Sequence, residues 1–161
     1  LRLNEVVPDA LSQLQMPVSA RHQCGESSYE QTLKAYQDLN IEHQVAKFID
    51  DMAKAYAWAD LVVCRAGATT IAELIAVGLG AILIPYPHAV DDHQTKNGLY
   101  LVKAHAAVII AQPDLSAEVL AATLQQLGQR AHCLQMAIAA KSIYLGEAVP
   151  QIIHHCEDLL K

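Results

Sequence analysis

The stretch DLVVCRAGATTIAELIAVGLGAILIPYPHAVDDHQTKN, residues 60–97, decides the fold. Two short apolar runs, residues 61–64 and 81–84, flank a helix-like segment at residues 69–77. The first run ends in Arg65-Ala66-Gly67, and the second is followed by a polar loop. This order predicts a strand, a tight turn, a helix, a second strand and a loop that carries chemistry.

Strands and helices alternate through the rest of the chain as well. We expect further strands within residues 17–24, 41–49 and 106–111, and further helices at residues 1–14, 26–39, 52–59, 94–104, 117–127, 129–141 and 147–161. Such alternation predicts one α/β domain with a mostly parallel, Rossmann-like sheet between two helical layers. The strands are expected to be apolar runs because both faces of such a sheet are covered.

In parallel sheets of this kind, ligands bind at the carboxyl ends of the strands. The expected ends are Cys24-Gly25, Phe48-Ile49, Arg65-Ala66-Gly67, Pro85-Tyr86 and Ala111-Gln112. We therefore expect the functional residues to lie at these five places.

Composition excludes several classes of function. The chain has 161 residues and a net charge of −6, which argues against a nucleic-acid-binding surface and against contact with an anionic membrane through this segment. No apolar run approaches the roughly 20 residues of a membrane span. The four cysteines form no C-x-x-C pair, and His154-His155 has no partner at ligand spacing, so we expect no metal site.

The tetrapeptide Gly67-Ala68-Thr69-Thr70 stands between a strand and a helix. Its small residues let a ligand approach the backbone, and the free N–H groups of a helix N-terminus suit a phosphate. The alternative is an ordinary strand-to-helix turn. The chain has neither a Walker A loop nor the G-x-G-x-x-G dinucleotide fingerprint.

Glu73 has two interpretations. Thr70-Ile71-Ala72-Glu73 matches a capping box, in which the glutamate bonds back to the N–H of the cap residue. Alternatively, the carboxylate faces the ligand and accepts hydrogen bonds from two neighbouring hydroxyls, such as the 2′,3′-diol of a ribose. Spacing alone favours the capping box.

A polar cluster follows the second strand of the central stretch: His88, Asp91, Asp92, His93, Gln94 and Asn97. It is either a solvated loop with Asp92 as a helix cap or a set of contacts to a hydroxyl-rich ligand. Gln94 and Asn97 are three residues apart and share a helix face. His22-Gln23, near the end of the strand within residues 17–24, is either a core edge or a neighbour of the site.

Two segments together resemble a known family. FIDDMAKAYAWADLVVCRAGATTIAEL at residues 48–74 and IPYPHAVDDHQTKN at residues 84–97 closely resemble the C-terminal half of the MurG family. Members of that family are bacterial glycosyltransferases that add N-acetylglucosamine from its UDP-sugar to lipid I, making the peptidoglycan precursor lipid II. The resemblance implies a GT-B fold, with the UDP-sugar donor held by this C-terminal domain.

The resemblance also implies roles for particular residues. Phe48 and the backbone of Ile49 would contact the uracil, and Glu73 would bind the ribose diol. The remaining donor contacts would come from helix N–H groups near the diphosphate and from side chains near the sugar: Ala68, Thr69, Thr70, His93, Gln94 and Asn97.

The family pattern differs from this chain in one respect. The family's domain begins with a strand and a Gly-Gly-Ser phosphate loop, which would precede residue 1 here; without that strand, an exposed seam is expected within the sheet. The acceptor domain, which would bind lipid I at the cytoplasmic face of the inner membrane, is also outside residues 1–161. No catalytic residue, cofactor or metal is therefore expected in this fragment. The alternatives are another UDP-sugar enzyme such as a 2-epimerase, a non-catalytic nucleotide-sugar-binding or interaction module, and a dimer formed through the seam.

Overall fold

The computed structural model describes residues 2–87, 92–146, 153, 156 and 157. Most of the helix expected at residues 147–161, including His154 and His155, lies outside these residues, as do His88 and Asp91.

Strands and helices alternate along the described chain, as predicted, with ends shifted by a few residues. The strands are β1 (Ser19–Gln23), β2 (Glu42–Ala46), β3 (Leu61–Cys64), β4 (Gly80–Leu83) and β5 (Ala107–Ile109). The α-helices are α1 (Arg2–Ser12), α2 (Tyr29–Gln37), α3 (Met52–Trp58), α4 (Ala68–Val77), α5 (His93–Lys103), α6 (Ala117–Leu127) and α7 (Arg130–Ser142), with short 3-10 turns η1 (Glu26–Ser28) and η3 (Gln112–Asp114).

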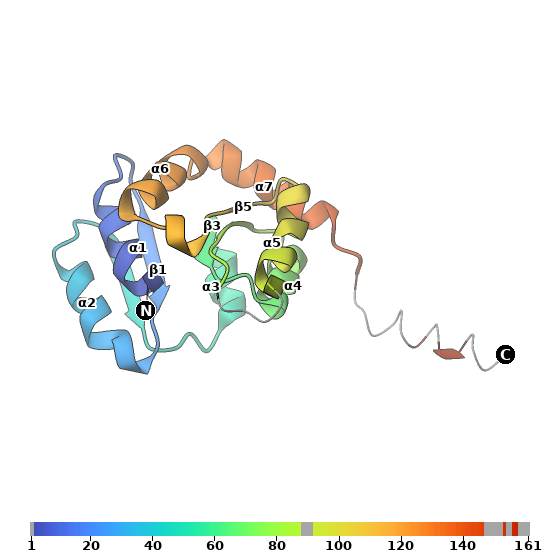
Figure 1. The fold of residues 1–161 in the computed structure, drawn as a ribbon, viewed down its shortest axis with the longest axis horizontal. Coiled ribbons are helices and arrows are strands. Elements are labelled where there is room, and N and C mark those ends of the chain that lie inside the picture. Colours follow the sequence, from blue (N-terminus) through green and yellow to red (C-terminus); the bar gives the residue numbers. More distant parts are fainter. Residues whose placement is uncertain (1, 88–91, 147–152, 154–155, 158–161) are drawn as a thin grey trace.

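All strand pairings are parallel, and they form two sheets. One sheet pairs β1 with β2, and the other has the order β3-β4-β5. Within the described residues, β1 and β3 each have a strand partner on one side only. Figure 1 shows β1 with α1 and α2 at one end of the molecule, and α4 with α5 at the other.

The expectation of apolar strands covered on both faces holds for the second sheet and is wrong for the first. Every residue of β4 is buried, whereas β1, with the sequence SARHQ, alternates between exposed and half-buried residues. Alternate side chains of β1 are exposed, so only one face of this strand packs against the protein. Ala20 and His22 lie on that packed face.

Alternate residues around β4 point into two different cores. Ile82 and Ile84 join a core with residues of α1 and α6, such as Leu11 and Leu120. Ala81 and Leu83 join a second core that includes Leu74 of α4. Because successive strand residues face opposite sides, β4 lies between two helical layers, which confirms the predicted three-layer arrangement.

Side chains cap the first turns of two helices. The Asp51 side chain accepts from the Lys54 N–H at 3.0 Å at the start of α3. The Ser116 hydroxyl accepts from the Val119 N–H at 3.2 Å at the start of α6. Both satisfy donors that the first turn of a helix leaves without intrahelical partners.

Gly80, the first residue of β4, allows α7 to approach the sheet closely. A Cβ atom at this position would lie 2.7 Å from the Met136 Cβ atom, so helix or strand would have to shift. We expect Gly80→Ala to lower the free energy of unfolding by about 1–2 kcal/mol through overpacking. Urea unfolding monitored by circular dichroism measures this, and an unchanged midpoint would show that α7 is not packed against Gly80 as described.

Candidate functional site

The carboxyl ends of three strands are joined by Arg65, which follows β3. Its Nη1 atom donates to the carbonyl oxygens of Ile84 at 3.1 Å and Pro85 at 3.3 Å, just beyond β4. Its Nη2 atom donates to Gln112 Oε1 at 2.6 Å, beyond β5. The guanidinium is half-buried, and this burial lowers its pKa from the ordinary value, although arginine stays charged. These bonds bring the carboxyl ends of β3, β4 and β5 together at one edge of the sheet.

Replacing Arg65 removes donors from three acceptors at once. We expect Arg65→Met to lower the free energy of unfolding by about 1–2 kcal/mol. Hydrogen bonds from a charged group stabilise a protein more than neutral ones do, but partial exposure of the guanidinium to water reduces their contribution. Arg65→Lys should recover only part of the loss. A lysine ammonium lacks the planar guanidinium that bonds to the carbonyls beyond β4 and to Gln112 beyond β5 at the same time. Denaturant unfolding of both variants tests this; equal midpoints for wild type and Arg65→Met would contradict it.

The loop after β2 is tied to the end of β1 by Gln23. The Ile49 N–H donates to Gln23 Oε1 at 2.9 Å, and the Cys24 N–H donates to the Ala46 carbonyl at 3.0 Å. Phe48 is 68% exposed beside this anchored backbone. The loop therefore presents an exposed aromatic ring beside an anchored peptide group. Such a ring can stack on the face of a planar base, and the peptide group can hydrogen-bond to the edge of the base.

His22 and Gln23 play separate parts. His22 lies in a half-buried network, with Nδ1 3.0 Å from the Tyr36 hydroxyl and Nε2 3.0 Å from Asn4 Oδ1. Burial lowers its pKa, which keeps the ring neutral near pH 7. His22 is thus a core-edge residue, whereas Gln23 is a neighbour of the Phe48-Ile49 loop.

The start of α4 presents backbone N–H groups without a side-chain cap. The helix begins at Ala68, and its cap residue, Gly67, has no side chain that could bond to the first turn. Its first intrahelical bond runs from the Ile71 N–H to the Gly67 carbonyl at 3.0 Å. Ala68 and Thr69 are exposed, and Thr70 is half-buried. The N–H groups of these residues and the positive end of the helix dipole are therefore available to an anion.

The capping-box prediction for Glu73 is wrong. Because α4 begins at Ala68, Thr70 is already inside the helix and Glu73 lies well past the first turn. The Glu73 carboxylate instead accepts a hydrogen bond from the Tyr56 hydroxyl of α3, with 2.9 Å between Oε2 and the hydroxyl oxygen. Glu73 is half-buried, so a carboxylate stands near the turn with acceptor capacity left over.

The start of α5 brings further polar side chains to the same edge. Gln94 Oε1 accepts from the Tyr86 N–H at 2.9 Å, and Asn97 Nδ2 donates to the Ala66 carbonyl at 3.4 Å. His93 is exposed at the first position of the helix. Asp92 occupies the cap position in a left-handed conformation, with φ 52°, but its side chain caps no N–H. Asp92 therefore does not act as the predicted cap.

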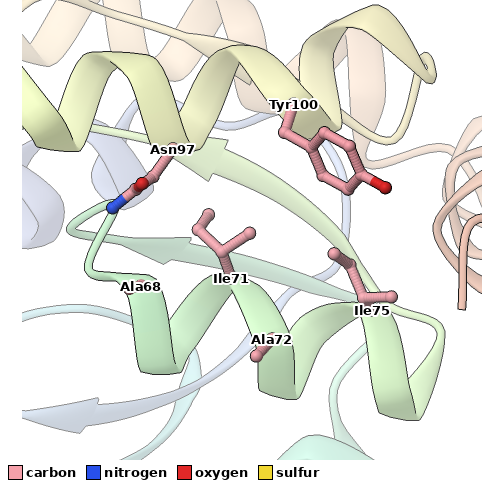
Figure 2. Close-up of a pocket in the computed structure, with 6 residues that line it drawn as sticks. All are labelled: Ala68, Ile71, Ala72, Ile75, Asn97 and Tyr100. Atoms are coloured by element: carbon pink, nitrogen blue, oxygen red, sulfur yellow. The ribbon is translucent and has the colours of Figure 1, made fainter. Parts of the chain in front are cut away.

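A groove runs between α4 and α5 from this edge. It has a volume of about 210 Å³ and is lined by Ala68, Ile71, Ala72, Ile75, Asn97 and Tyr100. Figure 2 shows the Asn97 amide at the Ala68 end of the groove, beside the start of α4, and the Tyr100 ring near the other end. The polar end of the groove thus coincides with the uncapped helix N-terminus.

The cysteine at the end of β3 is not an activated nucleophile. Cys64, the last residue of β3, has its pKa raised to about 12 by burial, so its sulfur stays a thiol rather than a reactive thiolate. In the part of the chain that the structure describes, no group of three His, Cys, Asp or Glu side chains could hold a metal ion. The described arrangement suits binding of a polar, anionic ligand.

The sequence of nearly the whole chain matches one family. Residues 1–155 match the sequence model of the glycosyltransferase family 28 C-terminal domain. The chain belongs to this family. The family 28 domain described here is 49% identical over 158 residues to the UDP-N-acetylglucosamine–N-acetylmuramyl-(pentapeptide) pyrophosphoryl-undecaprenol N-acetylglucosamine transferase of Marinobacter nauticus, covering 95% of this chain and 43% of the relative.

Two further comparisons agree. The enzyme of the same name from Aeromonas hydrophila is 46% identical over 158 residues, covering 98% of this chain and 44% of the relative. The crystal structure of MurG from Acinetobacter baumannii superposes with a TM-score of 0.93 at 40% identity, covering 98% of this chain and 46% of that chain. This likeness confirms the predicted Rossmann-like C-terminal half of a GT-B glycosyltransferase. The chain thus spans less than half the length of these relatives.

No helix among the described residues of the family 28 domain is long and apolar enough to cross a membrane.

Proposed function

We propose that this chain is the donor-binding domain of an inverting N-acetylglucosaminyltransferase, which transfers N-acetylglucosamine from its UDP-sugar to lipid I to form lipid II. The observation that carries the proposal is the 49% identity, over 95% of this chain, to a relative named for that transfer. The geometry of the strand ends supports the proposal, because groups there would contact each part of a UDP-sugar.

The nucleoside would occupy the side of the site formed by β2, α3 and α4. Phe48 would pack against the uracil, and the Ile49 backbone, which Gln23 anchors, would hydrogen-bond to the edge of the base. Glu73 would accept hydrogen bonds from the ribose hydroxyls. A carboxylate has about four acceptor positions, and the Tyr56 hydroxyl uses one of them.

The diphosphate would lie at the N-terminus of α4. The uncapped N–H groups of Ala68, Thr69 and Thr70 and the helix dipole would hold its negative charge. The charge on the leaving UDP increases during transfer, so these groups would stabilise the transition state as well as the bound donor.

The N-acetylglucosamine would lie at the start of α5. Asn97 lines the polar end of the groove beside Ala68, and His93 and Gln94 belong to the same helical turn. Amide and imidazole groups can donate to and accept from sugar hydroxyls. In this proposal the acceptor hydroxyl attacks the anomeric carbon as UDP leaves, which inverts that carbon.

The binding site for the acceptor and the general base would belong to the part of the enzyme outside this chain. The relatives are more than twice as long, which leaves room for an acceptor domain that meets lipid I at the cytoplasmic face of the inner membrane. The one-sided edges of β1 and β3 are consistent with a further strand between them in the complete protein.

Calorimetric titration of UDP-N-acetylglucosamine into the chain tests the proposal. We expect saturable binding with one site, competition by UDP, and much weaker competition by other nucleoside diphosphates. A titration without heat of binding, confirmed by unchanged thermal unfolding in excess ligand, would show that this domain does not hold the donor.

A further inference from the structure

Tyr56 and Glu73 form a part-buried contact between two helices. The Tyr56 hydroxyl, on α3, lies 2.9 Å from Glu73 Oε2, on α4, and only 8% of the Tyr56 residue is exposed. Hydrogen bonds from a hydroxyl to a carboxylate are among the stronger ones in proteins. Glu73 is the residue proposed to bind the ribose. Tyr56 makes no contact with the donor in that proposal.

This contact has no part in ending or starting either helix. The first turn of α3 is capped by Asp51, and α4 begins at Ala68 without using Glu73. Burial, and then the bond to Glu73, raise the pKa of Tyr56 well above its usual value. Tyr56 therefore keeps its hydroxyl proton at neutral pH and can donate it to the Glu73 carboxylate.

The contact leaves a defined set of acceptor positions. The Tyr56 proton occupies one position on Oε2, so one position on Oε2 and both positions on Oε1 remain. A glutamate side chain has three rotatable bonds, and a free one would lose this rotational freedom on binding a ligand. Holding the carboxylate in place beforehand removes that cost from the binding step.

We propose that Tyr56 is a positioning residue, which fixes the Glu73 carboxylate so that it accepts hydrogen bonds from both ribose hydroxyls of the donor. This inference rests on the proposed function, since it deepens the role given there to Glu73. It predicts that the effect of the Tyr56 hydroxyl on affinity depends on the presence of the ribose hydroxyls.

The test compares two nucleotides across three proteins. Dissociation constants for UDP and 2′,3′-dideoxy-UDP are measured by calorimetry for the wild-type chain, Tyr56→Phe and Tyr36→Phe. We expect Tyr56→Phe to weaken UDP binding by about three- to tenfold, the loss of one hydrogen bond, and to leave dideoxy-UDP binding unchanged. Tyr36→Phe is the matched control, because it removes another buried hydroxyl, one that bonds to His22 instead.

Three results would overturn an assignment, and they differ from one another. Equal weakening of both nucleotides by Tyr56→Phe would show a general packing role, and unchanged UDP binding would show that the hydroxyl positions nothing. Either result overturns the role of Tyr56 while leaving the donor site intact. A wild-type chain that binds both nucleotides equally would instead remove the ribose role of Glu73, and with it this part of the proposed function.

A measurement without ligand covers the case in which Tyr56→Phe folds poorly. Three-bond NMR couplings of the Glu73 methylene groups in the wild-type chain report whether the side chain keeps one rotamer. We expect couplings of a single staggered conformer. Averaged couplings would show that Tyr56 does not hold the carboxylate and would overturn the proposal.

Discussion

Glu73→Gln is expected to weaken binding of UDP-N-acetylglucosamine by about ten- to a hundredfold. The substitution keeps the size of the side chain and an oxygen that can accept from Tyr56, but it removes the negative charge that the ribose hydroxyls would contact. Losing charged hydrogen bonds costs about 1.5–3 kcal/mol, and 1.4 kcal/mol corresponds to tenfold in affinity. Calorimetric titration of wild type and variant side by side gives the ratio.

The fold should survive this substitution. Glu73 takes no part in capping α4, and the nearby core contact of Leu74, which is fully buried, is unaffected. We expect the thermal midpoint of Glu73→Gln to stay close to that of wild type, since substitutions away from the core usually change stability by less than about 0.5 kcal/mol. Equal affinities of the two proteins for the donor would show that Glu73 does not contact the ribose.

Ala68→Asp is expected to have opposite effects on stability and on binding. Ala68 is the exposed first residue of α4. A carboxylate there interacts favourably with the helix dipole, which stabilises the fold by about 0.3–1 kcal/mol. The same charge would repel a diphosphate at that helix N-terminus. Two unit charges about 5–6 Å apart repel by roughly 3 kcal/mol at an effective dielectric constant near 20, which predicts a loss of donor affinity of about a hundredfold.

Ala131→Asp provides the matched control for this experiment. Ala131 is the exposed second residue of α7, so the variant gains the same charge in the first turn of a helix. In the proposal, α7 makes no contact with the donor. It should gain similar stability and bind the donor as wild type does. Unfolding curves and titrations in low and high salt measure both effects. Undiminished affinity of Ala68→Asp would place the diphosphate elsewhere.

Local patterns predicted the elements around residues 60–97 well. The apolar run Leu61–Cys64 is β3, and the small residues at 66–68 mark the turn into α4, because hydrophobic runs and turn residues act over a few neighbouring positions. The same reasoning misplaced the start of α4 by one residue. Helix ends are the least determined part of a sequence pattern. The capping-box interpretation of Glu73 required Thr70 as the cap and a helix beginning at residue 71, three residues after the observed start.

The contacts that organise the site could not be predicted from spacing. Gln23 bonds to Ile49, 26 residues away, and Arg65 bonds to Gln112, 47 residues away. Tyr56 belongs to the hydrophobic core, so its position in the sequence does not reveal that its hydroxyl bonds to Glu73. Each of these pairs depends on the parallel order of the strands and the packing of the helices, which appear only once the chain is folded. The position of Gln23 and Arg65 at strand ends was the one signal available.

The most direct test is a crystal structure of this chain with UDP-N-acetylglucosamine bound. The proposal predicts the uracil against Phe48, a ribose hydroxyl within about 3.2 Å of a Glu73 carboxylate oxygen, and the diphosphate at the N–H groups of Ala68, Thr69 and Thr70. A donor bound elsewhere on the domain, or in this site with its ribose directed away from Glu73, would contradict it.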